Sequence, residues 1–243
     1  LLSQSHPKEA APDERDAFRK KQANAAVCLL ELGETESVWP LFQHAPDPSL
    51  RSFIIDRIAR LGANHQPLAA RIKQEPDPAS RYALTLALGQ FDLANMSSQQ
   101  RQSLEEQLSA LYRDDPEPGV HSAAGWMLRN WQQNQTVTET DTKLKNPLPK
   151  QDHNWFVNSQ GQTFTVANGP VVFMMGEKTE RTEPKKVTLS HSFAVATHEV
   201  TVAQFQKFRI DHEHDARYAP KPDCPVNMAS WYDAVAYCNW LSE

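Results

Sequence analysis

The sequence has few cysteines and no long apolar run, and each absence excludes a class of protein. Three cysteines, Cys28, Cys224 and Cys238, stand far apart among 243 residues. They form neither a CxxC motif nor the framework of a small disulfide-rich protein. The apolar runs are only a few residues long, whereas a helix that crosses a bilayer needs roughly 20 apolar residues. We therefore expect no membrane segment within this chain, and no feature of it assigns a cellular compartment.

A strong charge of one sign is also missing. The chain has 25 Lys and Arg against 30 Asp and Glu, a formal net charge of −5. The arginines of the N-terminal half are interspersed with acidic residues and do not form a basic stripe. Such a surface has no general attraction for nucleic acid or anionic membranes. We expect no nucleic-acid partner.

Motifs that would carry a reaction are absent as well. The sequence contains no GxxxxGK[ST], GxGxxG, GxSxG or HExxH pattern, which excludes the common signatures of phosphate binding, dinucleotide binding, hydrolase nucleophiles and zinc proteases. No residue is therefore assigned a catalytic, cofactor-binding or metal-binding role. We expect this chain by itself to have no catalytic activity.

The surroundings of the cysteines predict which thiols are accessible. Cys28 lies in an apolar helical run and Cys238 on an apolar helical stripe, so both are expected to be buried as small apolar side chains. Cys224 lies in a turn between Pro222 and Pro225 and is expected to be the most accessible of the three. A disulfide between Cys224 and Cys238 stays open at this point.

Residues 1–131 show helical periodicity throughout. Asp47-Pro48 has the pattern of a helix start, an acidic cap followed by proline. The apolar residues Leu50, Ile54, Ile58 and Leu61 then recur on one face, and Gly62 has the pattern of a helix end. The same reasoning predicts helices over residues 13–32, 77–88 and from Ser97 onward. The N-terminal half is therefore predicted to be all-α.

A phrase of proline and acidic residues repeats within this half. Pro46-Asp47-Pro48-x-x-Arg51, Pro76-Asp77-Pro78-x-x-Arg81 and Pro116-Glu117-Pro118-x-x-His121 are 30 residues (76 minus 46) and 40 residues (116 minus 76) apart. Each phrase precedes an apolar helix, which indicates units that must stack on a neighbour to bury their apolar faces. The pattern resembles HEAT-like repeats. An irregular helical bundle with proline-rich turns is the alternative.

The pattern changes after residue 131. Residues 132–153 are polar with scattered aliphatic residues and are predicted to form an exposed linker. From residue 154, short runs of β-branched and aromatic residues predict strands at 164–166, 171–174, 186–189 and 193–196. Two helices follow, starting at Thr201 and Ser230, each with the spacing of a capping box. The periodicity of this half indicates an α+β domain.

Three segments of residues 154–243 resemble the formylglycine-generating enzyme / sulfatase-modifying factor family. The segment 169–176 is similar to the family's entry strand, and residues 192–205 to its F-x-I…E-V-T-x-x-x-F element. The third segment is similar to the stretch P-V-x-x-V-S-W-x-D-A-x-x-Y-C-x-W through Pro225, Val226, Ser230, Trp231, Asp233, Ala234, Tyr237, Cys238 and Trp240. Met228 and Ala229 depart from it, standing where a polar residue and valine are usual. The resemblance implies the first half of a C-type-lectin-like domain.

The resemblance also bears on cofactors. Formylglycine-generating enzymes oxidise a sulfatase cysteine with molecular oxygen and copper held by two cysteines, and the family's copper and calcium sites lie in its later half. Neither Cys224 nor Cys238 matches the copper-binding pair, so no cofactor is expected in this segment. The resemblance allows copper and calcium in a full-length parent. A related branch that uses non-haem iron has a His-rich helical motif, which the single histidines of residues 1–131 do not match.

Three other groups of residues have side chains of the types found in reactive or binding sites. Asp211-His212-Glu213-His214-Asp215 has metal-ligand residue types, but its spacing does not by itself supply a zinc site. A solvated loop is the favoured interpretation. His198-Glu199 could work as an acid–base pair, yet Glu199 is expected to orient or cap the following helix. The aromatics Trp231, Tyr232, Tyr237 and Trp240 are expected to form core and rim rather than a ligand cage.

The chain begins at Leu1, and the apolar stripe of its last helix still continues at Leu241. We therefore expect a fragment of a longer multidomain protein, with an architecture similar to that of large bacterial proteins. Three functions stay open. The first is a binding or scaffold module that recognises a protein or peptide partner. The others are a formylglycine-generating oxidase in the full-length parent and a regulatory region of a serine/threonine protein kinase.

Overall fold

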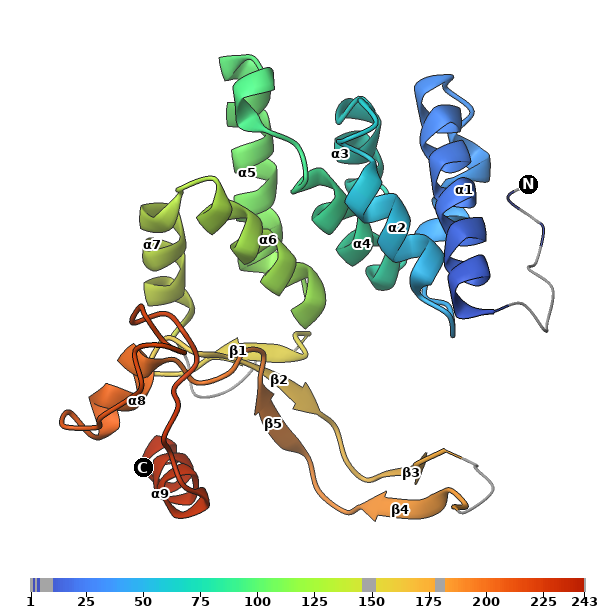
Figure 1. Cartoon of the computed structure of the whole chain (residues 1–243). Coiled ribbons are helices and arrows are strands. Elements are labelled where there is room, and N and C mark those ends of the chain that lie inside the picture. Colours follow the sequence, from blue (N-terminus) through green and yellow to red (C-terminus); the bar gives the residue numbers. More distant parts are fainter. Residues whose placement is uncertain (1, 3, 5–10, 146–151, 178–181, 243) are drawn as a thin grey trace. The chain divides into compact units, whose positions relative to one another are not determined.

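The computed structural model describes residues 2, 4, 11–145, 152–177 and 182–242 (Figure 1). The chain separates into two compact units, Leu1–Lys143 and Leu144–Glu243. The first unit is helical and the second combines short strands with two helices, so the α-rich N-terminal region and the β-containing C-terminal region are confirmed. Within the described residues, no helix combines the length and apolar character needed to cross a bilayer.

The first unit is built from pairs of helices that are joined by short turns. Its α-helices are α1 (Pro12–Glu31), α2 (Ser49–Arg57), α3 (Gln66–Ile72), α4 (Pro78–Leu88), α5 (Ser98–Asp114), α6 (Pro118–Asn130) and α7 (Asn134–Leu144). Short 3-10 turns lie at Thr35–Ser37, Trp39–Phe42 and Leu93–Asn95. Helix α1 packs on α2, α3 on α4, and α5 on α6, while α4 also contacts both α2 and α6. Three pairs therefore stack through their second helices (Figure 1).

The repeated proline phrases lie at the start of each second helix. Pro78 and Pro118 occupy the first turns of α4 and α6, where a missing amide hydrogen costs nothing. In the second and third phrases, a buried carboxylate two residues before the acidic residue accepts that residue's backbone amide. Glu75 accepts the amide of Asp77 and Asp115 accepts that of Glu117, each at 3.0 Å. The sequence repeat therefore corresponds to a repeated turn structure.

An ion pair joins two of these turns. The Arg81 Nε and Nη2 atoms donate to the two carboxylate oxygens of Asp115 at 3.0 and 3.2 Å. The Nη1 atom of Arg81 donates to the backbone carbonyls of Glu75 and Pro76 at 3.1 and 2.9 Å. The side chains of Arg81 and Asp115 are 16% and 6% exposed, so little water competes for this contact. Arg81 thus connects the turn before α4 to the turn before α6.

One hydrophobic core runs through the first unit. Every helix pair contributes fully buried side chains to it, including Ile54, Ile58, Leu68, Ile72, Leu84, Leu88, Leu108, Met127 and Leu128. The predicted stripe of α2 is therefore confirmed at Ile54 and Ile58, whereas Leu61 beyond the helix is 46% exposed. The stacked pairs bury their apolar faces against one another, as a repeated unit must.

Helix α7 corrects the predicted linker. Residues 132–153 were expected to be exposed and irregular, but Asn134–Leu144 form a helix and Val137 is buried in the core of the first unit. The sequence TVTETDTKL is polar because most of this helix faces solvent. A single apolar side chain does not produce a visible periodicity, so the linker prediction is wrong for this part.

The second unit contains a three-stranded sheet and a separate hairpin. Strands β1 (Trp155–Val157), β2 (Thr163–Ala167) and β5 (Phe193–Ala196) form an antiparallel sheet in the order β1-β2-β5. Strands β3 (Val171–Met175) and β4 (Lys185–Leu189) pair antiparallel, with Phe173 opposite Val187. Helices α8 (Val202–Phe208) and α9 (Trp231–Leu241) follow. The four predicted strands are thus found, and β1 was missed because it is only three residues long.

Apolar side chains of the second unit are unusually exposed. All five residues of β3 are exposed, and so are Phe193 and Val195 of β5. On α9 the predicted apolar stripe does not face a core: Trp231 is 71% exposed and Cys238 is exposed as well. The buried position of this helix is Tyr237. The periodicity located the helix correctly but not the face that it buries.

The cysteine predictions need the same correction. Cys28 and Cys238 are exposed, whereas Cys224 has intermediate exposure, and all three are free thiols. Cys28 lies on α1 beside the buried Val27, but on the side of the helix away from the core. Apolar neighbours in the sequence therefore did not predict burial, because the side of the helix decides it.

Candidate functional site

The Asp211–Asp215 cluster is a loop held by protein contacts. The His212 ring lies 4.6 Å from that of Phe205, and its Nε2 is 2.9 Å from the carbonyl oxygen of Asn227. The Asn227 side chain accepts the amide of Asp215 at 2.7 Å, and Arg217 donates to the Asp215 carboxylate. The Arg217 hydrogen bonds lower the pKa of Asp215. Among the described residues no group of three or more His, Cys, Asp or Glu could hold a metal ion.

The His198-Glu199 pair lies at the surface before α8. The Nδ1 atom of His198 is 2.9 Å from the Thr197 hydroxyl, and both His198 and Glu199 are exposed. Helix α8 is capped instead by Thr201, whose hydroxyl accepts the amide of Gln204 at 3.2 Å. The expected capping role of Glu199 is therefore wrong.

The aromatics of α9 divide between core and surface. Tyr237 stacks on Phe205 with ring centroids 5.3 Å apart, and its hydroxyl accepts a hydrogen bond from Gln162 at 2.8 Å. Burial raises the pKa of Tyr237. Trp231 and Tyr232 are 71% and 78% exposed and pack edge to face against each other. These four aromatics therefore form a core contact and an exposed pair rather than a closed cage.

The start of α9 is electrostatically well defined. Ser230 accepts the amide of Asp233 at 3.2 Å, and the Asp233 carboxylate accepts from the amide and hydroxyl of Ser230 and from Arg209. The Ser230 hydrogen bonds, together with Arg209, lower the pKa of Asp233 to about 2. The predicted capping box is present, and we assign its carboxylate the structural role of stabilising the start of α9.

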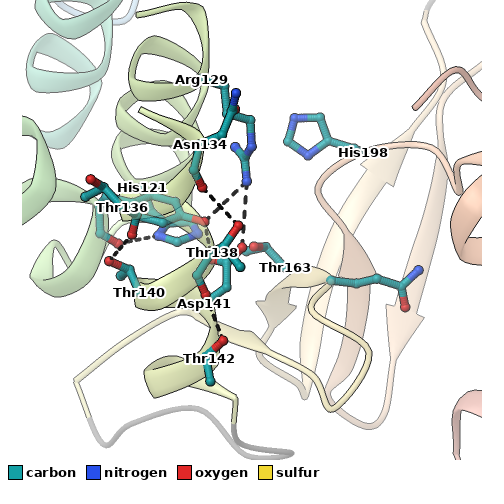
Figure 2. A network of polar contacts seen from close by, with 12 residues as sticks. His121, Arg129, Asn134, Thr136, Thr138, Thr140, Asp141, Thr142, Thr163 and His198 are labelled. Carbon is teal, nitrogen blue, oxygen red and sulfur yellow. Dashed lines mark hydrogen bonds and ion pairs between the residues drawn. The ribbon is translucent and has the colours of Figure 1, made fainter. Parts of the chain in front are cut away.

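A polar network in the first unit was not predicted. The Tyr112 hydroxyl donates to the Asp141 carboxylate. The Arg129 guanidinium lies 3.9 Å from that carboxylate, and Figure 2 shows Arg129 and Asp141. The buried His121 ring stacks on Tyr112 at 4.3 Å between centroids, with its Nδ1 2.6 Å from the Tyr112 carbonyl oxygen. Burial, followed by the nearby Asp141 charge, raises the pKa of Tyr112. The phenol therefore stays protonated and serves as a donor.

Two hollows mark the surface of the first unit. A groove of about 670 Å³ is lined by α5, the end of α3 and the Arg81–Asp115 pair. A second hollow of about 430 Å³ lies between the ends of α2 and α4, beside His65 and Phe91. Burial lowers the pKa of His65, which favours its neutral form. Of the charged side chains that line the larger groove, Glu75, Arg81, Asp114 and Asp115 are engaged in ion pairs.

Two exposed aromatics lie on neighbouring second helices. Trp126 of α6 is 41% exposed and Tyr82 of α4 is 36% exposed. A Cβ at Gly89 would overlap the Trp126 ring, and a Cβ at Gly119 would contact the Tyr82 ring at 3.4 Å. Each aromatic ring therefore rests against a glycine of the neighbouring helix. Sequence reasoning missed this surface, because the two contacts depend on how α4 and α6 are aligned.

The two contacts define the alignment of α4 and α6. Tyr82 and Gly89 are seven residues apart on the α4 side, and Gly119 and Trp126 are seven residues apart on α6. The helices therefore run parallel, and the two contacts are offset by about 10 Å along the helix axis at 1.5 Å per residue. Both rings pack against a glycine of the neighbouring helix and keep part of their surface exposed.

Comparison with known families bears on the second unit. Residues 149–243 match the family model of the sulfatase-modifying factor enzyme 1-like domain. This match confirms the resemblance of the C-terminal part of the chain. Searches of curated proteins and of solved structures returned no significant match.

Proposed function

We propose that this chain, whose residues 149–243 match the sulfatase-modifying factor enzyme 1-like domain, is a binding module for a protein or peptide partner. The observation that carries the proposal is the pair Tyr82 and Trp126 on adjacent helices of the first unit. Tyr and Trp are enriched at protein interfaces and dominate their binding energy. Because glycines hold both rings in place, little side-chain entropy is lost when a partner binds.

The spacing of the aromatics favours an extended peptide. A polyproline II helix has three residues per turn and rises about 3.1 Å per residue, so residues on one face recur about every 9 Å. This repeat is close to the offset of about 10 Å along the helix axis between the contacts of Tyr82 and Trp126. Aromatic surfaces bind such peptides because the ligand is already ordered before binding. We therefore propose a proline-rich segment as the partner.

We further propose finer assignments for both units. The helix pairs stacked through α2, α4 and α6 support HEAT-like repeats, and the proline-acid-proline turns support a repeated unit. The strands β1–β5 and the helices α8 and α9 are consistent with part of a C-type-lectin-like domain in a multidomain bacterial protein. Both assignments rest on the order and packing of elements, and fold by itself does not assign function.

Binding is tested by NMR titration of the full chain with a ten-residue peptide that has proline at every third position. We expect the Trp126 indole signal to shift and Trp126→Ser to weaken binding about tenfold or more. Leu32→Ser is the matched control, because Leu32 is 76% exposed but lies after α1, and it should bind as the wild type does. Equal binding of a peptide with the same composition and irregular proline spacing would contradict the proposal.

Formylglycine formation by a longer protein is the second candidate, and the family match favours it. In the chain itself the three free cysteines lie on α1, on the loop before α9 and on α9. The described residues do not fit a copper site of paired thiols in any contact that the structure shows, so no oxidation step is assigned to them. A regulatory region of a serine/threonine kinase is a further alternative.

We expect the purified chain to leave a sulfatase-derived cysteine peptide unchanged. The incubation contains copper, oxygen and a reductant, and mass spectrometry of the peptide is the measurement. The expectation follows from the absence of a matching thiol pair. Conversion that Cys224→Ser abolishes would assign a catalytic thiol to Cys224 and would reverse this conclusion.

A further inference from the structure

Helix α7 has little intrinsic stability. Its eleven residues are fewer than the roughly 12–15 that an isolated helix needs in water. Four of them are threonines, Thr136, Thr138, Thr140 and Thr142, and β-branched side chains lose rotamer freedom in a helix. Three of these hydroxyls donate to the carbonyl four residues earlier at 2.8–2.9 Å, an arrangement that slightly destabilises helices. The helix therefore depends on its contacts with α5 and α6.

Those contacts are concentrated at two positions of the helix. Of the α7 residues, all of which are described, Val137 alone is buried. One turn later the Asp141 carboxylate accepts the Tyr112 hydroxyl. The same carboxylate lies 3.9 Å from Arg129, and both of these residues are labelled in Figure 2. Just before the helix, Gln133 donates to Glu105 at 3.1 Å. By contrast, seven of the thirteen residues of α6 are buried, so its stability is shared among many contacts.

We infer that α7 is a detachable cap of the helical unit, which undocks and unfolds while α1–α6 stay folded. Helix α7 covers the end of the α5–α6 pair, and its exposed side is polar. A terminal cap of a helical array has the same arrangement. Segments with few buried apolar contacts open at a lower free energy than the whole domain. The Tyr112–Asp141–Arg129 contact holds α7 in its docked position.

Undocking has two structural consequences. It uncovers the Tyr112 phenol and the apolar surface around Val137, which then become available to a partner. It also converts eleven helical residues, which rise about 1.5 Å each, into chain that can extend by about 3.3 Å per residue. The segment that joins the two units then becomes longer. A ligand that favours the open form would shift this equilibrium by its differential affinity.

Native-state hydrogen exchange of the full chain tests the inference. We expect α7 amides to exchange roughly a hundredfold faster than the slowest amides of α5 and α6. Asp141→Ala should increase α7 exchange about tenfold or more, since it removes a charge-assisted hydrogen bond. Glu139→Ala is the control on the same helix, because Glu139 is exposed and bonded only to Gln135 among the described residues. It should change α7 exchange less than about threefold.

Two results would overturn the inference. The first is exchange of α7 at the rate of α5 and α6 in the wild type, which would make α7 part of the cooperative unit. The second is an Asp141→Ala variant in which the amides of α4 accelerate by the same factor as those of α7. That result would mean that Asp141 stabilises the whole unit and that α7 does not open separately. Peptide binding at Tyr82 and Trp126 is measured independently of both results.

Discussion

Replacing Arg81 with methionine is expected to lower the free energy of unfolding of the helical unit by about 3–5 kcal/mol. Methionine keeps much of the side-chain volume but leaves the Asp115 carboxylate, 6% exposed, without its guanidinium partner. Removing one partner of a buried ion pair costs more than the pair itself contributes, because the remaining charge stays desolvated. The backbone carbonyls of Glu75 and Pro76 lose a donor as well. Urea denaturation followed by circular dichroism at 222 nm measures the change.

Arg60→Met is the matched control for this prediction. Arg60 pairs with Asp56 at 2.9 Å, but the two side chains are 73% and 48% exposed. Exposed pairs contribute about 0–1 kcal/mol because water and salt screen them. The difference between the two variants therefore isolates the effect of burial. A similar loss in both, or no loss for Arg81→Met, would show that the Arg81–Asp115 contact does not join the two turns as the structure describes.

Helix boundaries were largely predictable from the sequence because capping is local. Helix α4 begins at Pro78, directly after the predicted cap Asp77, and α5 follows the predicted cap Ser97. The predicted capping boxes at Thr201 and Ser230 are likewise present. Each of these structures forms between residues three positions apart, so a short stretch of sequence contains all the information that it needs.

The sequence-based predictions that were wrong concern contacts between residues far apart in the sequence. Helix α7 docks through Asp141 and Tyr112, which are 29 residues apart, and its polar sequence does not indicate this partner. The stripe of α9 shows the correct period, yet which side is buried depends on Phe205 and Gln162 in other elements. Periodicity predicts that a helix has an apolar side but not what covers it.

The candidate binding surface was hidden from sequence reasoning for the same reason. Gly89 is the residue that caps the C-terminus of α4, and Gly119 lies in the first turn of α6. Their second property, close contact with Trp126 and Tyr82, appears only when α4 and α6 are aligned. The exposure of the two aromatics likewise follows from the helix stacking.

Ile58→Ala should lower the free energy of unfolding by about 2–5 kcal/mol, because Ile58 is fully buried in the core where α2 meets the stacked pairs. The loss combines the transfer of apolar atoms with the cavity left behind. Leu61→Ala is the control from the same predicted stripe. Leu61 is 46% exposed, so its truncation should cost about 1 kcal/mol or less.

Denaturation of both variants under the same conditions decides between two models of the helical unit. In the stacked model, α2 buries Ile58 against the neighbouring pairs, and the losses in free energy of unfolding of the two variants differ by several fold. In an irregular bundle, the α2 stripe would face solvent along its length. Both variants would then lose little free energy of unfolding, and by similar amounts. Ile54→Ala provides the independent check, because Ile54 is also fully buried one turn earlier on α2 and should show a loss of the same size as Ile58→Ala.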